Sequence, residues 1–149
     1  MTEARYKFQR LTVYGLALDY VDMVYGLARE LPAGEQFNLC AQLQRAGTSI
    51  VLNIAEGSTG QTDPEQKRFL GLALRSYLET VACLDIIERR GYVPYEGLER
   101  VREAGHGVFV KLQSFRKALG GGRTTGDGGR GEKDRRRETG DRGPKTDER

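Results

Sequence analysis

The stretch QLQRAGTSIVLNIAEG at residues 42–57 carries the pattern on which the fold prediction rests. Apolar residues recur here at steps of three and four, the spacing that places side chains on one face of an α-helix. Gly57 and Gly60 follow, and glycine readily takes the left-handed conformation that ends helices. These features predict a helix from about Glu35 to Glu56. Its buried stripe consists of Leu39, Leu43, Ala46, Ile50 and Ile54.

Three further segments repeat the helical spacing, and turn signals separate them. The predicted helices span about Leu11 to Leu31, Asp63 to Arg90 and Tyr95 to Leu119. We expect Asp63 to cap the third helix, Pro64 to take its first position and Gln66 to complete a capping box. Gly91 should end that helix. Short connections and the lack of period-two alternation predict an all-α, antiparallel up-down-up-down four-helix bundle.

The first predicted helix has two adjacent apolar seams, a wider face than one neighbouring helix needs. The first seam comprises Leu11, Tyr14, Leu18, Val21, Tyr25 and Ala28. The second comprises Val13, Ala17, Tyr20, Val24, Leu27 and Leu31. The fourth helix has a heptad seam that contains Gly105, with Gly107 beside it. Each glycine weakens a helix by roughly 1 kcal/mol relative to alanine, so either these glycines admit a close neighbour or they form a soft spot.

Composition divides the chain near residue 120. Residues 120–149 contain nine of the 20 glycines, nine Lys/Arg and seven Asp/Glu, and no large apolar residue. Such a segment buries too little surface to offset its ordering entropy, so we expect a folded domain at 1–119 and a disordered tail at 120–149. The chain's net charge of +3 excludes a strongly basic, histone-like protein. The tail suits an RNA-contacting arm and an inert extension equally well.

The sequence contains few residues of the types that bind metals or act as nucleophiles. Cys40 and Cys83 lie in apolar helical patterns and are expected to be buried, reduced thiols. His106 is the one histidine and no Cys-x-x-Cys spacing occurs, so we expect no metal and no cofactor. The opening residues lack the apolar core of a signal peptide, and no apolar run approaches the ~20 residues of a membrane span. We therefore expect a cytoplasmic protein without a membrane partner.

Polar residues follow one strip on the second predicted helix and one on the third. These strips contain Arg45, Ser49, Asn53 and Glu56, and Arg68, Arg75, Ser76 and Glu79. Facing strips form hydrogen-bond networks between helices or subunits. The expected members of a structural polar network are Ser49, Asn53, Glu56, Ser76 and Glu79. The alternative is that Glu56 and Glu79 act as an acid–base pair, but no metal-ligand set, nucleophile–base pair or phosphate loop accompanies them. We expect no catalytic residue and no enzyme.

Residues 42–57 resemble the QLRRA..SI..NIAEG signature of the bacterial four-helix-bundle family encoded within 23S ribosomal RNA intervening sequences. Residues 68–92 are similar to that family's FL..A..S..E segment and its closing GY turn. The opening at residues 11–17 resembles the family's start, so the resemblance covers about residues 8–119. Gln44 replaces one of two consecutive arginines in the family pattern, which removes a basic position.

The resemblance implies a nucleic-acid-associated homo-oligomer without a known catalytic activity. The family is related to the accessory variability protein of diversity-generating retroelements, a ring-like homopentamer that binds nucleic acid and a reverse transcriptase. By this analogy we expect a homo-oligomer, a pentamer by family resemblance, with RNA or DNA as its partner. A reverse transcriptase is a candidate second partner.

Basic side chains on the predicted helices are candidate nucleic-acid contacts. The expected contacts are Arg45, Lys67, Arg68, Arg75, Arg89 and Arg90. Further basic residues on the fourth helix are Arg100, Arg102, Lys111, Arg116 and Lys117. A ring would repeat each of them and convert a weak site into a multivalent one. The leading hypothesis is a homo-oligomeric protein that binds RNA or an RNA–DNA duplex, as an intervening-sequence or retroelement accessory protein. The alternative is a protein–protein interaction scaffold that uses the apolar face of the first helix.

Overall fold

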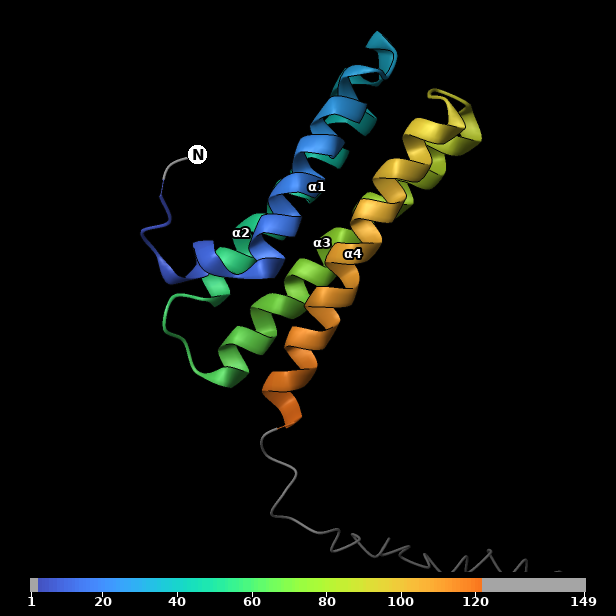
Figure 1. Cartoon of the computed structure of the whole chain (residues 1–149). Coiled ribbons are helices and arrows are strands. Elements are labelled where there is room, and N and C mark those ends of the chain that lie inside the picture. Colours follow the sequence, from blue (N-terminus) through green and yellow to red (C-terminus); the bar gives the residue numbers. More distant parts are fainter. Residues whose placement is uncertain (1–2, 122–149) are drawn as a thin grey trace, which may run out of the picture.

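Helices make up the regular structure of residues 3–121, the part of the chain that the computed structural model describes. The long helices are α1 (Thr12–Arg29), α2 (Ala41–Gly57), α3 (Asp63–Arg90) and α4 (Tyr95–Gly121). Short 3₁₀ turns occur at Lys7–Arg10 and Ala33–Glu35, and a π-helical turn at Gln36–Cys40 leads directly into α2 (Figure 1). The predicted all-α class is confirmed.

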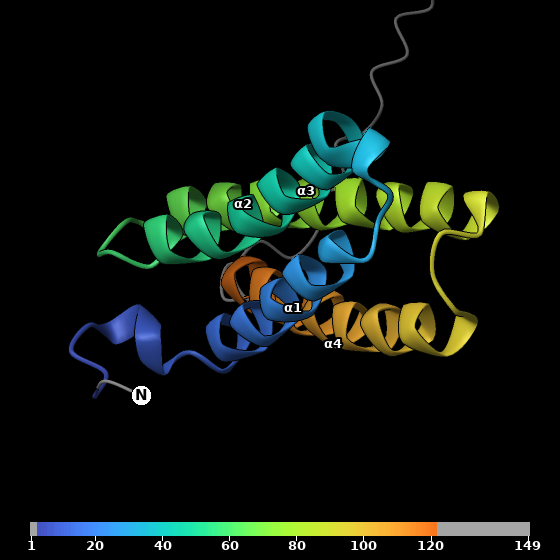
Figure 2. The ribbon, with the colours of Figure 1, turned by 90° about the horizontal axis from the view of Figure 1, so that it is seen from above.

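Within one chain, each of the four helices packs against two others. Both α1 and α3 pack against α2 and α4. Arg45 and Ser49 on α2 pair with Glu79 and Ser76 on α3, so the partner's number falls as the number on α2 rises. These two helices are therefore antiparallel. Figures 1 and 2 show α3 and α4 side by side as a long hairpin, with α2 beside α3 and α1 beside α4. The arrangement is the predicted four-helix bundle.

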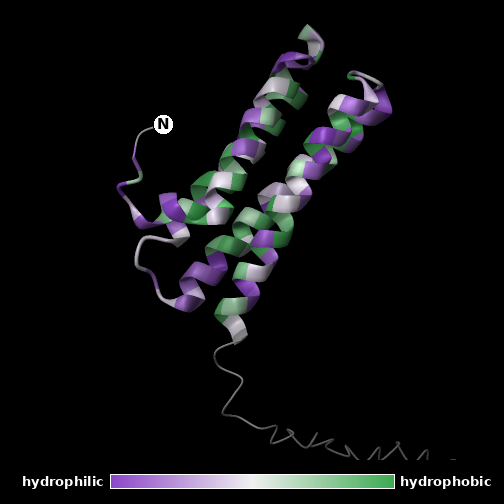
Figure 3. Ribbon diagram, viewed as in Figure 1, coloured by the Kyte–Doolittle hydropathy of each residue, from purple (hydrophilic) through white to green (hydrophobic). Residues whose placement is uncertain are grey.

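The core forms where the apolar stripes of the helices meet, and Figure 3 shows apolar and polar residues alternating around each helix. Full burial of a leucine or isoleucine side chain contributes about 1.5–3 kcal/mol, so the stripe on α2 is a main source of stability. All five predicted members of that stripe are buried. The second seam of α1 is also buried, whereas Leu18 and Tyr25 of its first seam remain 36% and 37% exposed.

Gly105 on α4 lies against the aromatic rings of Tyr20 on α1 and Tyr77 on α3. A Cβ atom at this position would lie 2.8 Å from Cε2 of Tyr20 and 3.0 Å from Cε2 of Tyr77. Tyr20 is held in place by a 2.7 Å hydrogen bond to the Thr80 hydroxyl. Close approach is therefore the reason for a glycine in this seam. At Gly107 no neighbouring side chain lies within 4 Å of the Cβ position, so its glycine has no packing role.

The N-terminal cap of α3 is Thr62, one residue before the predicted cap. Thr62 has an extended backbone and its hydroxyl accepts a 3.4 Å hydrogen bond from the backbone N–H of Glu65. Asp63 is already helical, so its predicted role as the cap, with a capping box to Gln66, is wrong. Gly91 ends α3, as predicted, and its φ of 65° is the left-handed conformation.

Gly57 ends α2 for a reason other than left-handed backbone. A Cβ atom at Gly57 would lie 2.6 Å from Cβ of Phe69 on α3. The left-handed turn is made by Gly60, whose φ is 91°. The predicted cap conformation at Gly57 is thus wrong, and the glycine instead lets the end of α2 pack tightly against α3.

The two cysteines are free thiols within the bundle. Cys40 is half-buried and its Sγ donates a 3.3 Å hydrogen bond to the carbonyl of Ala28. Cys83 is buried, and burial together with the nearby Glu79 raises the pKa of its thiol. The predicted burial is therefore confirmed for Cys83, whereas Cys40 is only half-buried.

The last helix continues past the predicted end of the folded domain. Leu119 was the expected last residue, but α4 runs to Gly121. Residues 122–149, where a disordered tail is predicted, lie outside the described residues. None of the helices in the described part of the chain is long and apolar enough to cross a membrane.

Candidate nucleic-acid interface

A groove of about 450 Å³ runs between the first half of α3 and the second half of α4. Its basic residues are Arg68 and Arg75 on α3 and Arg116 on α4. No carboxylate is among the residues that line it. The remaining lining residues are Gly71, Leu72, Leu74, Leu78, Phe109 and Gln113. This arginine groove is therefore a positively charged hollow with an apolar floor.

Arg116 reaches across the groove to α3. Its Nη2, Cζ and Nε atoms lie 3.4, 3.6 and 3.7 Å from the position that a Cβ atom would take at Gly71. The similar distances indicate that the guanidinium group lies across the glycine rather than meeting it end-on. An added Cβ atom would make an ordinary van der Waals contact with this group, and a side chain longer than alanine would compete with it for space.

Most of the charge in the arginine groove is available to an external anion. Arg68 contacts Glu65 at 3.4 Å, but the two side chains are 58% and 50% exposed, and exposed pairs of this kind contribute only ~0–1 kcal/mol. The Arg68 guanidinium also lies 4.6 Å above the Phe69 ring. Within residues 3–121, neither Arg75 nor Arg116 forms an ion pair.

Lys67 extends the basic surface toward the end of α4. Its Nζ lies 3.1 Å from the position that a Cβ atom would take at Gly120. The last turn of a helix carries a partial negative charge, so an ammonium group is favourable there. The structure thus gathers three predicted contacts, Lys67, Arg68 and Arg75, and adds Arg116.

The other three predicted contacts lie elsewhere. Arg45 is on α2, outside the groove, and contacts Glu79 with an Nη2-to-Oε2 distance of 3.0 Å, in a pair whose side chains are both more than half exposed. Arg89 and Arg90 are at the far end of α3, about 21 Å along the helix from Arg75 at 1.5 Å per residue. Arg90 donates a 3.3 Å hydrogen bond to the hydroxyl of Tyr92. The six predicted residues therefore form no single patch.

The predicted polar network forms in part between α2 and α3. The hydroxyls of Ser49 and Ser76 are 2.8 Å apart. Asn53 donates to the carbonyl and the hydroxyl of Ser49 at 2.8 and 3.1 Å. Glu79 belongs to the Arg45 ion pair at the same interface. Glu56 is exposed, and its backbone carbonyl accepts hydrogen bonds from Thr59 and Gln61 in the loop after α2, so its carboxylate does not join this network.

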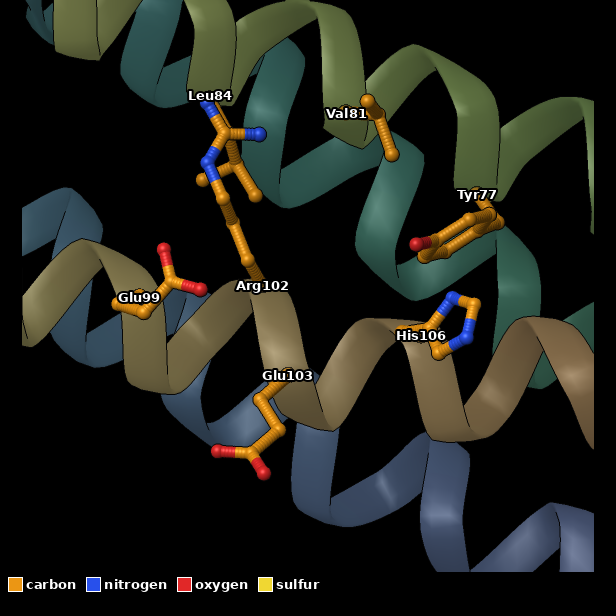
Figure 4. A pocket seen from close by; sticks show the side chains of 7 residues that line it. All are labelled: Tyr77, Val81, Leu84, Glu99, Arg102, Glu103 and His106. Carbon is orange, nitrogen blue, oxygen red and sulfur yellow. The ribbon is translucent and has the colours of Figure 1, made fainter.

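A second groove, of about 540 Å³, lies nearer the α3–α4 turn. Figure 4 shows Arg102 extending from α4 toward Leu84, and His106 facing Tyr77. Glu99 and Glu103 also line this groove, and Arg102 contacts Asp85 and Glu88 at 2.9 and 3.2 Å. Its charges are mixed, which makes it a poorer phosphate site than the arginine groove. No cluster of three or more metal-ligating side chains occurs among the described residues.

A row of aromatic rings separates the two grooves. Tyr20 and Tyr77 have ring centroids 5.9 Å apart, and Tyr77 and Phe109 are 5.5 Å apart with an interplanar angle of 29°. His106 lies 6.3 Å from Phe109. Desolvation by burial raises the pKa of Tyr20 to about 12 and also raises that of Tyr77. The row therefore runs from the neutral phenols of Tyr20 and Tyr77 in the core to Phe109 and His106 nearer the surface.

Sequence reasoning found the arginines but missed how they are arranged. Arg116 was one of several basic residues on the fourth predicted helix, and nothing in its spacing distinguished it. The informative signal is Gly71, a glycine inside a helix opposite an arginine on the neighbouring antiparallel helix. This pairing becomes readable only once the register between α3 and α4 is known.

Comparison with known proteins gives a consistent assignment of fold. A family model described as 23S rRNA-intervening sequence protein matches residues 9–113. A solved structure of a protein of unknown function, from the S23 ribosomal protein family of Bacteroides thetaiotaomicron, is similar with a TM-score of 0.65 and 26% sequence identity. The similarity covers 70% of this chain and 95% of that one. No curated protein matches this chain. Arg68 and Arg75 lie within the matched segment, and Arg116 lies just beyond it.

Proposed function

The chain belongs to the 23S rRNA-intervening sequence protein family, and from this membership we propose that it is a non-enzymatic, homo-oligomeric protein that binds nucleic acid. The observation that carries the proposal is the arginine groove, which is lined by Arg68, Arg75 and Arg116 and by no carboxylate. RNA is the first candidate ligand and an RNA–DNA duplex the second. The proposed site of action is the cytoplasm.

Guanidinium chemistry supports this ligand class. An arginine binds a phosphate group through two parallel N–H···O hydrogen bonds, and such charge-assisted bonds are stronger than neutral ones. Three arginines along one groove suit a ligand with several phosphates in a row. The net charge of the whole chain is only +3, and charges are screened over ~8 Å at physiological ionic strength. Attraction therefore depends on phosphates that enter the groove.

Exposed apolar side chains support the homo-oligomer. Ile86 on α3 is 48% exposed, and Leu18 and Tyr25 on α1 are 36% and 37% exposed. Contact between copies would remove this surface from water. A ring, a pentamer by family resemblance, would repeat the arginine groove and raise avidity without any new contact. A reverse transcriptase remains the proposed second partner by the same resemblance.

Fluorescence anisotropy with labelled RNA tests the proposal. The informative variant is Arg75→Gln/Arg116→Gln, which removes two groove charges that have no ion-pair partner in the described residues. The matched control is Arg29→Gln/Arg100→Gln, because both arginines are exposed, lie outside the groove and carry the same total charge. We expect the groove variant to lose at least tenfold in affinity and the control to lose less than threefold. Equal losses in the two variants would show that binding follows net charge, and no binding by the parent protein would refute the proposal.

One observation favours the alternative function, a protein–protein interaction scaffold. Phe37, between α1 and α2, is 90% exposed, and Tyr95 at the start of α4 is 65% exposed. The α1–α2 connection and the α3–α4 turn lie at the same end of the bundle in Figure 1. A partner protein that covers this end would be captured from lysate after nuclease treatment and lost in Phe37→Ser. Capture that disappears with nuclease would favour nucleic acid instead.

A further inference from the structure

The floor of the arginine groove is apolar, which a phosphate chain alone does not require. Leu78 is 54% exposed and Phe109 is half-buried, and both line the groove together with the arginines. We infer that the groove binds an unpaired strand of nucleic acid in preference to a duplex, with phosphates on the arginines and a base against Phe109. This inference rests on the proposed function and specifies its ligand.

Phe109 has the properties of a stacking platform. Its ring packs against Tyr77 with a centroid distance of 5.5 Å and an interplanar angle of 29°. Tyr77 in turn packs against Tyr20, which is tied to Thr80 by a 2.7 Å hydrogen bond. The aromatic ring is therefore held from the core, and a base that stacks on it needs to order no loose side chain.

Arg116 adds a second flat surface. Its guanidinium group lies across Gly71, so one side of the planar group faces α3. Guanidinium planes stack on nucleobases as well as binding phosphates. Phe109 and Arg116 are both on α4 and line the same groove of about 450 Å³. Phe109 and Arg116 are seven residues apart on α4, about 10.5 Å along the helix at 1.5 Å per residue, so the ring and the guanidinium group would contact different bases of one unpaired strand.

A duplex cannot use the same surfaces. Its bases are already paired and stacked on one another, and its phosphates lie on the outside, so it would meet the arginines alone. The exposed side chain of Leu78 would then gain nothing from the contact. Stacking of bases on aromatic side chains tolerates any sequence, because every base has a π-face. The expected preference is therefore for unpaired strands without a strict sequence requirement.

The test measures the affinity of the full-length protein for four labelled probes at one salt concentration. The probes are single strands of RNA and DNA of about 12 nucleotides, an RNA duplex of the same length, and an abasic strand with the same number of phosphates. We expect either single strand to bind about fivefold or more tightly than the abasic strand and the duplex, the ratio that stacking of one base supplies. The RNA and DNA arms show which sugar the groove accepts.

A pair of variants separates stacking from folding. Phe109→Leu keeps an apolar side chain but removes the ring, and Phe115→Leu makes the same change on α4 at a residue that does not line the arginine groove. We expect Phe109→Leu to lose the advantage of the intact strand over the abasic strand while binding the abasic strand as before. Phe115→Leu should retain that advantage.

The outcomes distinguish the inference from the proposed function. Equal binding of the intact strand, the abasic strand and the duplex would overturn the inference and leave nucleic-acid binding intact. An intact-strand advantage that survives in Phe109→Leu would also overturn it. Failure of every probe to bind would refute both.

Discussion

The guanidinium group of Arg116 on α4 lies 3.4 Å from the position that a Cβ atom would occupy at Gly71 on α3. This relationship joins two helices across the arginine groove and places a cation above an apolar floor. A glycine inside a helix costs roughly 1 kcal/mol relative to alanine. A Cβ atom at Gly71 would meet the guanidinium group at an ordinary van der Waals distance, so alanine would fit here and only a longer side chain would displace Arg116.

Gly71→Leu is expected to displace Arg116 and weaken RNA binding severalfold without unfolding the bundle. The longer side chain occupies the space that the guanidinium group now fills, while helix propensity improves. Anisotropy titrations and thermal unfolding of the same preparations measure both effects. Gly107→Leu is the matched control on α4, since no neighbouring side chain lies within 4 Å of its Cβ position. Unchanged RNA affinity in Gly71→Leu would mean that Arg116 does not contact the ligand.

Gly105→Ala and Gly107→Ala are expected to change stability in opposite directions. A methyl group at Gly105 meets the rings of Tyr20 and Tyr77 at 2.8 and 3.0 Å, and overpacking of a core costs about 1–3 kcal/mol. At Gly107 the added methyl group meets no neighbour, so the variant gains the ~1 kcal/mol of helix propensity. Urea unfolding measures both free energies. Stabilisation of the protein by Gly105→Ala would contradict the close packing described at that position.

Alkaline pH should destabilise the protein through Tyr20. Burial raises its pKa to about 12 in the folded state, against 10.0 for an ordinary tyrosine. Below pH 10 the phenol is neutral in both states, and its full contribution to stability is present. As the pH rises from 10 toward 12 the unfolded chain releases this proton first, so the free energy of unfolding falls.

Tyr20→Phe is the variant that isolates this effect. It removes the ionisable group, and the Thr80 hydroxyl still donates a 2.5 Å hydrogen bond to the carbonyl of Tyr77. Its stability should therefore fall less steeply between pH 10 and 12 than that of the parent. Circular dichroism during urea titrations at each pH gives the comparison. Parallel curves for the two proteins would show that Tyr20 does not govern the alkaline loss.

Ile50→Asp should unfold the bundle, whereas Leu52→Asp should leave it folded. Ile50 is fully buried on α2, and an unpaired buried charge costs several kcal/mol. Leu52 is only two residues away but is 58% exposed, so a carboxylate there stays in water. Helicity and melting temperature of both variants are the measurements. A parent-like melt of Ile50→Asp would show that this face of α2 is not the core.

Much of the fold follows from the sequence because burial repeats with the helical period. The stripe through Leu43 and Ile50 identified the inner face of α2 correctly. The cap of α3 was misplaced by one residue because Thr62 and Asp63 both suit that position chemically. Gly105 was recognised as unusual, but its reason required the facing rings to be placed.

The candidate site was less predictable because it depends on contacts between helices. Spacing along one helix put Arg45 and Glu56 on a common strip with other polar residues. The antiparallel register then paired Arg45 with Glu79 and left Glu56 in solvent. The same register brought Arg116 against Gly71, a contact that no periodicity within α3 or α4 reveals.

The salt dependence of binding tests the role of the arginine groove most directly. For a single strand, each phosphate neutralised by a basic residue contributes about 0.7 to the slope of log affinity against log salt. Affinity for single-stranded RNA falls as salt rises. Titrations from low to physiological salt should therefore give a slope that is shallower by about 1.4 for Arg75→Gln/Arg116→Gln than for the parent. The same slope in both proteins would contradict the account, because it would show that these two arginines contact no phosphate.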